Sequence, residues 1–503
     1  MATRRTTTSR SSKSARPPKT ADTATGDDAP PKAEATDPGA PDPDAGDHAP
    51  DDPTDATDET ASYEARFVKR APPLPGQEGS GMPADLDELA ALPIPQLVER
   101  LNAYGLDLHA GIPRPKLLVG LMRAASRLGI DLVGGGQLEV LPDGYGFLRS
   151  ARNTFLPSPD DLYVAPALME SFKLRAGSRV RGRLRKGRRK DKYFALDELL
   201  EVNGKPPELA REVKPFDDLT PIFPDKRILL ETDDERDFSA RVVDLVAPLG
   251  FGQRGLIVSP PRSGKTMLLK ALANSITTNY PDVHLLVFLV DERPEEVTDM
   301  QRSVRGEVIA STFDEPPQRH VAVAERVDER ARSLVESGYD VVLLIDSITR
   351  LGRAFNAAAR TSGRILSGGL EAKALQKPKR LFGAARNIEG AGSLTILATA
   401  LVDTNSRMDE VIFEEFKGTG NMEIVLSRAV SEQRIYPAID VHKSGTRMED
   451  LLFDPDEAKL VRLMRTALAD LQPVEAISEL LRRLAKTGSN AEFLLSLMTN
   501  AHL

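Results

Sequence analysis

A lysine and a threonine at the end of a glycine-containing loop, and an aspartate at the end of an apolar run, are the residues best suited to chemistry. Residues 255–266 read GLIVSPPRSGKT, so Gly-Lys-Thr follows closely on a short apolar run. Residues 341–346 read VVLLID and end in Asp346. A strand followed by such a loop and a helix directs backbone N–H groups at an anion, where the helix dipole also favours negative charge.

In this arrangement Lys265 would reach the terminal phosphates of a nucleotide, and the Thr266 hydroxyl would ligate Mg²⁺. Asp346 would supply the carboxylate that holds the metal. Ser259 stands where the usual pattern G-x-x-x-x-G-K-[ST] has glycine, but the strand, loop and helix around it favour a nucleotide site over a chance tripeptide. Glu292 also follows an apolar run, on the ligand side of an open sheet. We therefore predict binding and hydrolysis of a nucleoside triphosphate.

The elements that must hold these residues alternate between strands and helices. Apolar strands are expected at residues 256–258, 285–290, 341–345 and 394–400, with helical segments between them. This alternation is typical of a mostly parallel sheet with helices packed around it. We assign residues 236–503 to one large α/β domain.

A small helical module is expected before this domain, over residues 83–133. Asp85 is a candidate N-cap, and Pro93 and Pro95 divide the leucine pattern into two short helices. A further helix is expected from residue 116 to about residue 128.

The pattern then changes to short strands over residues 134–204, separated by Pro, Gly, Asp and Asn. Such spacing predicts a small β-barrel. Residues 205–235, rich in proline and charge, are interpreted as a connector.

Composition bounds the remaining possibilities. The chain has 503 residues, no cysteine and a net charge of −8, so disulfides, thiolate catalysis and cysteine-based zinc sites are excluded. No apolar run approaches the roughly 18–20 residues that span a bilayer. Residues 1–82 are first basic and then acidic, with few large apolar side chains, and are predicted to be disordered. This tail is either an interaction segment or a solvated extension without a specific partner.

The predicted barrel has the composition of a single-stranded nucleic-acid binder. Tyr145, Phe147 and Arg149 alternate along one strand, and Tyr163 and Tyr193 add aromatic rings on neighbouring strands. Residues 173–192 carry eleven basic residues and one acid, with arginines at every second position from 179 to 185. Aromatic rings that stack on bases, beside cations for phosphates, suit sequence-tolerant binding. The alternative is that the rings belong to the barrel core and the arginines form a solvated edge strand.

From about Leu86 to the end, the chain resembles the bacterial transcription termination factor Rho family. The resemblance is carried by PDGYGFLRS, LIVSPPRSGKTMLL, LVDERPEEVTDMQR, ASTFDEP, LLIDSITRLGRA, KRLFGAARNIEGAGSLTILATAL, DEVIFEEFKGTGNMEI and YPAIDVHKSGTR. It implies a RecA-like P-loop ATPase domain preceded by a small helical module and an OB-fold barrel of the cold-shock type. It also implies a ring-shaped homohexamer that hydrolyses ATP with Mg²⁺, translocates along RNA and terminates transcription in the cytoplasm.

For the ATPase site, the resemblance implies four catalytic residues. Lys265 would bind the phosphates, Glu292 would polarise the attacking water, Asp346 would complete the metal arrangement, and Arg447 would act as an arginine finger across a subunit interface. Arg428 and Arg434 would be supporting interface cations. The further nucleotide contacts would be Gly250, Phe251, Gly252, Gln253, Arg254, Gly255, Arg262, Ser263, Gly264, Thr266, Met267, Arg293 and Tyr436.

Two RNA sites are implied in the same way. The primary site, on the barrel, would use Tyr145, Phe147, Arg149, Tyr163 and Tyr193 and select pyrimidine-rich single strands. The secondary site, in the ring channel, would use Ser362, Gly363, Arg364, Thr404, Ser406 and Arg407. RNA polymerase and its elongation factors would be partners.

Four positions depart from the family pattern. Arg262, Arg364 and Arg407 stand where lysine is common, and Phe251 replaces a common basic residue. We expect activity to persist, with shifts in nucleotide affinity and RNA stringency. Two rival functions remain: a rotary-type ATPase subunit, which would not need the barrel's aromatic residues, and an RNA-binding regulator, which would not need an intact nucleotide site.

Overall fold

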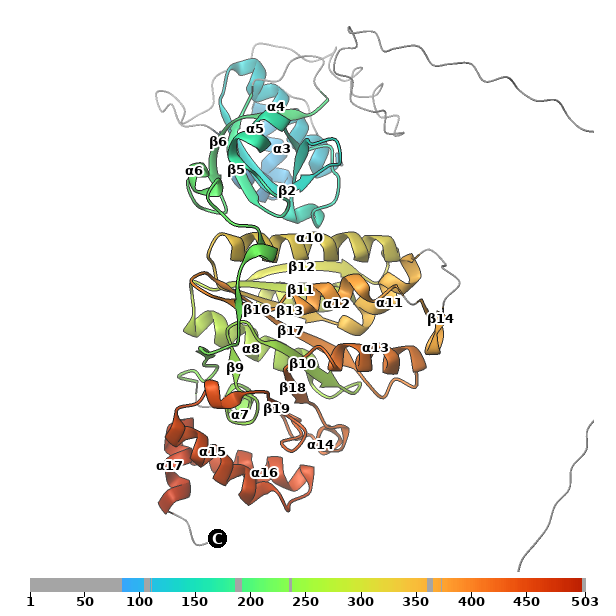
Figure 1. Ribbon diagram of the computed structural model, residues 1–503. Helices are drawn as coiled ribbons and strands as arrows, with labels where there is room; N and C mark the ends of the chain where they lie inside the picture. Colours follow the sequence, from blue (N-terminus) through green and yellow to red (C-terminus); the bar gives the residue numbers. More distant parts are fainter. Residues whose placement is uncertain are drawn as a thin grey trace, which may run out of the picture. The chain divides into compact units, whose positions relative to one another are not determined.

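The computed structural model describes residues 84–103, 109, 111–185, 192–234, 238–359, 365–371 and 373–499. A small helical module and a closed β-barrel precede a larger sheet covered by helices (Figure 1). The predicted fold class, a RecA-like α/β domain preceded by an OB-fold barrel, is confirmed in these elements. The disorder predicted for residues 1–82 concerns a segment outside the described residues.

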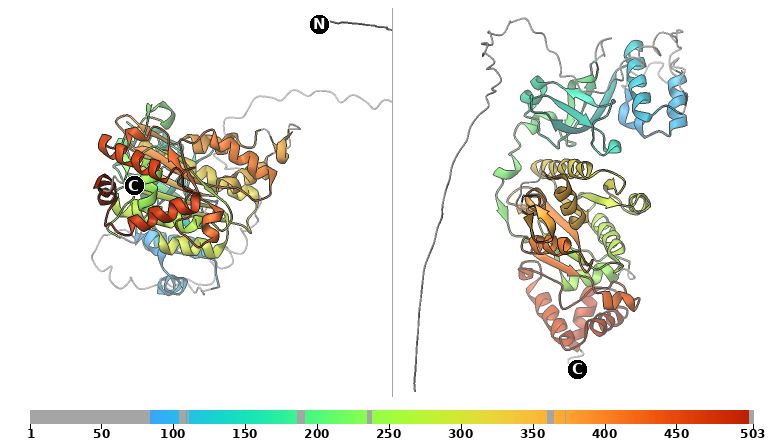
Figure 2. Two further views of the ribbon diagram at one scale, coloured as in Figure 1. Left: turned by 90° about the horizontal axis from the view of Figure 1, so that it is seen from below. Right: turned by 90° about the vertical axis from the view of Figure 1, so that its right-hand side faces the viewer.

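The helical module consists of α2 (Leu86–Ala91), α3 (Ile94–Ala103) and α4 (Arg114–Leu128). Asp85 caps α2 as predicted, because its carboxylate accepts the Asp87 N–H at 2.8 Å. Helix α4 begins two residues earlier than predicted, since a proline is favourable in the first turn of a helix. Buried leucines of the module and the barrel form one core, and the helices pack beside the barrel strands (Figure 2).

The barrel is built from β2 (Leu132–Val140), β3 (Gly146–Arg149), β4 (Leu162–Val164), β5 (Arg179–Leu184) and β6 (Phe194–Val202). The strands pair in the order β2-β3-β4-β6-β5, and β5 pairs back with β2. Helix α5 (Pro166–Phe172) connects β4 to β5. A closed barrel of five strands is the OB-fold architecture, in which one face commonly binds single-stranded nucleic acid.

The large sheet has a parallel centre. Its strands β12 (Glu307–Thr312), β11 (His284–Glu292), β13 (Val341–Asp346), β17 (Ser393–Leu401) and β10 (Arg254–Ser259) lie side by side in that order. Strand β18 (Met422–Val425) pairs with the other edge of β10, and β19 (Gly445–Thr446) follows it. Strand β17 therefore separates the strand before the loop from the strand that ends in Asp346.

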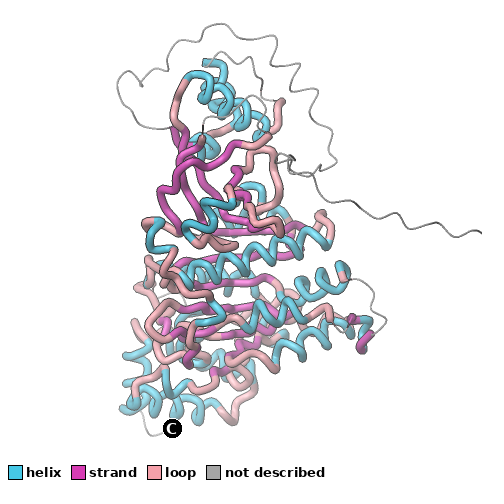
Figure 3. The backbone as a smooth tube through the Cα atoms, turned by 45° about the horizontal axis from the view of Figure 1, so that its top comes forward, coloured by secondary structure: helices cyan, strands magenta, loops and turns pink. Residues whose placement is uncertain are grey.

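Helices cover both faces of this sheet, so its strands are apolar throughout (Figure 3). Helices α10 (Pro317–Glu336), α11 (Ile348–Ala358), α12 (Gln376–Gly383) and α13 (Arg407–Lys417) pack on one core. Helices α7 (Phe238–Val246), α8 (Lys265–Asn279), α9 (Pro294–Ser303), α15 (Pro455–Leu468), α16 (Pro473–Leu484) and α17 (Asn490–Thr499) pack on the other.

The smaller elements complete the chain. They are β1 (Ala84–Asp85), α6 (Pro207–Ala210), β7 (Pro221–Ile222), β8 (Arg227–Ile228), β9 (Leu249–Gly250), β14 (Ile365–Leu366), β15 (Leu370–Glu371), β16 (Arg386–Ile388) and α14 (Arg428–Glu432).

Candidate nucleotide site and RNA-binding surfaces

The loop between β10 and α8 has the backbone of an anion-binding turn. Arg262 and Gly264 have φ values of +65° and +89°, in the left-handed region, and Lys265 begins the helix. Alternation between left- and right-handed residues turns successive N–H groups towards one concavity. The loop and the start of α8 together can therefore hold phosphate oxygens.

Ser259, the departure from the glycine pattern, stabilises this loop. Its hydroxyl lies 2.8 Å from the Ser263 hydroxyl and donates to the Pro260 carbonyl at 3.1 Å. Ser263 also hydrogen-bonds to the Pro260 carbonyl, and both serines are buried. A serine is thus accommodated because its hydroxyl closes the loop.

Lys265 lies between the two predicted catalytic acids. Strands β11 and β13 are parallel neighbours, so their carboxyl ends bring Glu292 and Asp346 to one edge of the sheet. The Lys265 ammonium is 3.3 Å from a Glu292 oxygen and forms an ion pair with Asp346. Thr399, at the end of β17, donates to the same Asp346 oxygen at 2.7 Å.

Electrostatics at this cluster suit proton transfer. Burial raises the pKa of Glu292, and Asp346 adds to the rise, while Lys265 and Arg350 oppose it. Burial acts to lower the pKa of Lys265, but Asp346 and Glu292 raise it overall. Arg350 lies 3.5 Å from Glu292 and was not foreseen from the sequence, where most arginines are surface residues.

An open groove runs along α8 beside the loop. Arg262, Ser263, Gly264, Met267 and Tyr436 all line it, together with polar residues of α8. A β carbon at Gly264 would lie 3.1 Å from the Tyr436 ring, so the ring rests on the loop. Met267 is 70% exposed, and the two side chains offer an apolar border for a nucleotide base.

Residues 250–255 lie at the opposite end of β10 from the loop, and none of them lines the groove. Phe251 is buried against Tyr280, with ring centroids 5.5 Å apart. Gln253 and Arg254 hydrogen-bond to Asn421. Six residues of strand separate the two ends by roughly 16 Å. Six of the predicted nucleotide contacts therefore lie away from the loop of their own chain. They are Gly250, Phe251, Gly252, Gln253, Arg254 and Gly255.

Arg447 is also at that far end. Its backbone N–H donates to the Asn421 carbonyl at 2.9 Å. Burial lowers the pKa of Arg254, and the nearby charge of Arg447 lowers it further. The exposed Arg447 side chain is therefore distant from its own Lys265. Arg293, Arg428 and Arg434 are exposed, with Arg293 directly after Glu292 and Arg428 paired with Glu432.

Four of the five predicted barrel residues form one aromatic cluster. Tyr145 lies 5.9 Å from Phe147 and 5.7 Å from Tyr163, and Phe147 lies 4.8 Å from Tyr193, measured between ring centroids. All four rings are half-buried, so their faces and edges remain accessible for stacking.

Arg149 lies beneath this cluster and is 6% exposed. Its guanidinium is 4.9 Å from the Phe147 ring centre, donates to Glu139 at 2.6 Å and pairs with Asp161. Burial raises the pKa of Asp161 to about 6, although Arg149 opposes the rise. Asp161 was not among the predicted site residues. The sequence signal for it is its position directly before the strand that carries Tyr163.

The arginine strand is not a direct neighbour of the strands that carry Phe147 and Tyr163, although Tyr193 precedes β6, which pairs with it. Arginines alternate with buried residues along β5 as predicted, but β2 and β6 separate β5 from β3 and β4. Arg181 pairs with Asp85, and Arg183 lies 3.3 Å from Glu198. Strand β5 pairs with both β2 and β6, so it is not the edge strand of the alternative interpretation, and its arginines Arg181 and Arg183 are held in ion pairs on the barrel surface.

The predicted secondary site is described in part. Ser362, Gly363 and Arg364 lie outside the described residues. Ser406 caps α13, and Thr404 donates to Asp409 at 2.6 Å, which leaves Arg407 exposed at the helix start. A β carbon at Gly368 would lie 2.9 Å from the Met408 nitrogen, so the segment after residue 364 contacts the Thr404–Arg407 turn.

The described residues contain neither a preformed metal cluster nor a membrane-spanning helix. Residues 84–499, apart from the gaps given above, contain no cluster of three or more His, Asp or Glu side chains able to hold a metal. Within the same residues, no helix is long and apolar enough to cross a membrane. Mg²⁺ bound with a nucleotide needs only one or two protein ligands, and the Thr266 hydroxyl and Asp346 carboxylate are oxygen donors of the kind it prefers.

A parallel sheet with a phosphate loop after β10 and acids at the ends of β11 and β13 defines a P-loop ATPase of the RecA-like class. In this chain the ATPase domain follows an OB-fold barrel.

Comparisons with known proteins narrow this class to one family. Residues 239–446 match the model of the ATP synthase alpha/beta family, nucleotide-binding domain, and residues 134–208 match that of the Rho termination factor, RNA-binding domain. Transcription termination factor Rho of Cereibacter sphaeroides is 52% identical over 417 residues, which cover 82% of this chain and 99% of that protein. The Haemophilus influenzae protein of the same name is 52% identical, covering 81% and 98%. The chain belongs to the transcription termination factor Rho family.

Proposed function

We propose that this protein is an ATP-driven translocase that moves along single-stranded RNA as a homohexameric ring and terminates transcription. The observation that carries the proposal is one chain that holds both an RNA-binding barrel and a Lys265–Glu292–Asp346 site. Each rival function explains only one of these two features. A rotary-type ATPase subunit would not need the aromatic cluster of the barrel, and an RNA-binding regulator would not need the Glu292–Asp346 acid pair.

In the proposed reaction, the γ-phosphate of ATP is transferred to water. Lys265 turns from Glu292 and Asp346 to the phosphates, and this frees Glu292 to orient the water and accept its proton. Thr266 and Asp346 would hold Mg²⁺, which would neutralise charge on the phosphate oxygens. Tyr436 and Met267 pack the base, and Arg262 and Arg293 lie near the phosphates.

The arginine finger is proposed to come from a neighbouring subunit. The position of Arg447 supports this proposal. Arg447 bonds to Asn421, which in turn bonds to Arg254 at the start of β10, whereas the loop follows the other end of that strand. A head-to-tail ring places that end of one subunit against the open groove of the next. Arg428 and Arg434 would line the same interface. Since an arginine finger contributes about 10³–10⁵ in rate, ring assembly would control hydrolysis.

RNA would bind the barrel through stacking on Tyr145, Phe147, Tyr163 and Tyr193. The Arg149 guanidinium beside the Phe147 ring would donate to a base edge, and the buried Asp161 would orient Arg149. As the family resemblance implies, we expect a preference for pyrimidine-rich single strands. Thr404, Ser406 and Arg407, with Ser362, Gly363 and Arg364, would contact RNA in the ring channel. Action on nascent RNA would bring the protein to RNA polymerase and its elongation factors in the cytoplasm.

ATP hydrolysis with and without poly-cytidylate RNA tests this proposal. Strong stimulation by RNA is the expected result. Robust hydrolysis that ignores RNA would favour a different ring ATPase, and absence of hydrolysis would favour the regulator.

A further inference from the structure

Glu139, on β2 of the barrel, lies between an arginine of the RNA site and an arginine of the ATPase domain. One of its oxygens accepts the Arg149 Nε–H at 2.6 Å. The other lies 3.3 Å from an Arg326 guanidinium nitrogen on α10. Each carboxylate oxygen therefore serves a different part of the fold.

Arg149, Glu139 and Arg326 form a row of alternating charges, and its Arg149 end reaches the predicted RNA surface. Arg149 contacts the Phe147 ring, and its remaining partner is Asp161. A base that accepts hydrogen bonds from the Arg149 guanidinium competes with Glu139 and Asp161 for it. RNA binding therefore changes how strongly Arg149 holds Glu139.

At the Arg326 end of this row, several buried polar atoms lack hydrogen bonds. The Arg326 nitrogen near Glu139 is buried but makes no hydrogen bond. One side-chain oxygen of Gln137 and one of Glu329 are likewise buried without a hydrogen bond. Arg326 also lies 3.1 Å from Glu329 on its own helix. A buried polar atom without a hydrogen bond is unfavourable, so this cluster gains from a small rearrangement that converts the Arg326–Glu139 ion pair into a hydrogen bond.

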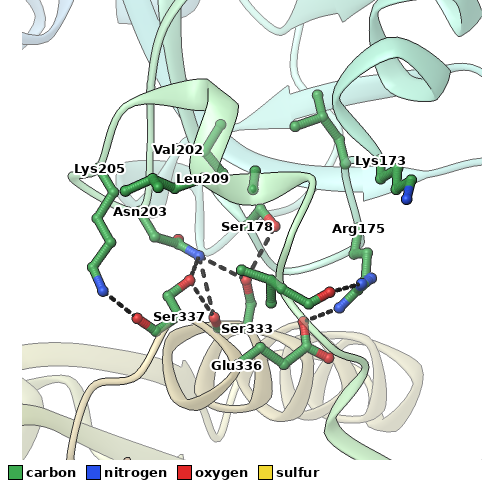
Figure 4. A pocket seen from close by; sticks show the side chains of 13 residues that line it. Lys173, Arg175, Ser178, Val202, Asn203, Lys205, Leu209, Ser333, Glu336 and Ser337 are labelled. Carbon is green, nitrogen blue, oxygen red and sulfur yellow. Dashed lines mark hydrogen bonds and ion pairs between the residues drawn. The ribbon is translucent and has the colours of Figure 1, made fainter. Parts of the chain in front are cut away.

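The contacts of Asn203 with α10, by contrast, are well bonded. The Asn203 amide donates to the Ser333 carbonyl, the Ser333 hydroxyl and the Ser337 hydroxyl, and Figure 4 shows these bonds beside a cavity of about 220 Å³. The Asn203 oxygen accepts Arg330 at 2.8 Å. The Asn203 end of α10 is thus anchored. At Arg326 the Gln137 amide donates to the helix carbonyl at 2.7 Å, whereas the Arg326 guanidinium can exchange partners.

Helix α10 in turn packs on the strands that carry the catalytic acids. Val327 and Leu334 of α10 share a core with Phe288 of β11 and Ile345 of β13. Close-packed cores transmit displacements because they have few voids. A shift of α10 at Arg326 would therefore reach the strands that end in Glu292 and Asp346.

We propose that Glu139 and Arg326 are positioning residues that relay RNA occupancy of the barrel to the ATPase site. When RNA engages Arg149, Glu139 is released from it and completes a hydrogen bond with Arg326. This inference rests on the proposed function, namely that the barrel binds RNA and that RNA stimulates hydrolysis.

The test uses the full chain with the variants Arg326→Gln, Glu139→Gln and the double variant. Two quantities are measured: the affinity for a fluorescent oligocytidylate, and ATP hydrolysis at zero and saturating poly-cytidylate. We expect Arg326→Gln to keep RNA affinity and basal hydrolysis within about twofold of the parent chain and to lose at least about fivefold of the stimulation. Because both residues act in one relay, the double variant should lose no more stimulation than Arg326→Gln alone.

Matched variants separate this relay from loss of structure. Arg332→Gln changes an arginine on the same helix that pairs with Asp328 and Asp217 and should leave stimulation unchanged. Arg326→Lys keeps the charge and should restore at least half of the stimulation. Parental stimulation in Arg326→Gln, or multiplied losses in the double variant, would overturn the relay. A parent chain that RNA does not stimulate would overturn the proposed function itself, before any variant is compared.

Discussion

The Tyr436 ring rests on Gly264, so that a β carbon at this glycine would lie 3.1 Å from two ring atoms. Gly264 also has a φ of +89°, which only glycine adopts without strain. The loop that would hold the phosphates and the ring that would pack the base are thus in direct contact.

Gly264→Ala should therefore weaken ATP binding. The added methyl group strains the backbone and pushes Tyr436 from the groove, and we expect at least a tenfold weaker affinity for a fluorescent ATP analogue. Gly418→Ala is the control, because that glycine has a φ of −63° and its nearest neighbour would be 4.0 Å away. Unchanged affinity in Gly264→Ala would contradict the assignment of this groove.

Glu292→Gln should lower RNA-stimulated hydrolysis by about 10²–10⁴, the usual contribution of a general base. Nucleotide binding should persist, since the amide keeps the size of the side chain and Lys265 can still turn to the phosphates. Steady-state hydrolysis and ATP affinity measure the two effects separately. Glu295→Gln, an exposed neighbour in the first turn of α9, should retain full activity. Undiminished turnover in Glu292→Gln would remove Glu292 from the mechanism.

Mixing two inactive variants tests the finger in trans. Lys265→Ala and Arg447→Ala should each be inactive as pure proteins. In randomly mixed rings about a quarter of the interfaces combine an intact loop with an intact finger, so hydrolysis should reappear. A mixture as inactive as its components would show that Arg447 does not act across the interface.

Tyr145→Ala with Phe147→Ala should weaken RNA binding at the barrel. Stacking contributes about 1–3 kcal/mol per base, so the affinity for oligocytidylate should fall at least tenfold. ATP affinity should not change. Phe223→Ala removes an exposed aromatic ring outside the barrel and serves as the control. Normal binding by the double variant would refute the proposed primary site.

Glu329 should make the fold less stable as pH rises. Burial raises its pKa to about 7, with added repulsion from Glu139, Asp328 and Glu325 and opposition from Arg326. A raised pKa in the folded state means that the folded chain holds a proton the unfolded chain releases, so stability falls between about pH 4.5 and pH 7.

The melting temperature of Glu329→Gln, compared with the parent chain from pH 5 to pH 8, measures this effect. The variant should be the more stable of the two at pH 8, and the difference should shrink towards pH 5. Glu170→Gln, an exposed glutamate of α5, should follow the parent curve. A variant that loses stability equally at every pH would argue against a titrating Glu329.

Much of the nucleotide site was predictable because its signals are local. The apolar run before Ser259, the Gly-Lys-Thr that starts α8 and the acid ending residues 341–346 lie within short segments, and strand-end geometry brings them together. The alternation of aromatic residues around Tyr145 likewise predicted a shared face of the barrel.

Other features depend on contacts between distant segments, and local patterns carry no signal for them. Only the tertiary structure placed residues 250–255 and Arg447 at the far end of β10, because strand direction decides which end faces the loop. It separated β5 from the strands that carry Phe147 and Tyr163, since strand order in a closed barrel does not follow chain order. The Ser259–Ser263 bond, the burial of Arg149 between Glu139 and Asp161, and the link from Glu139 to Arg326 are likewise side-chain pairings that only packing selects.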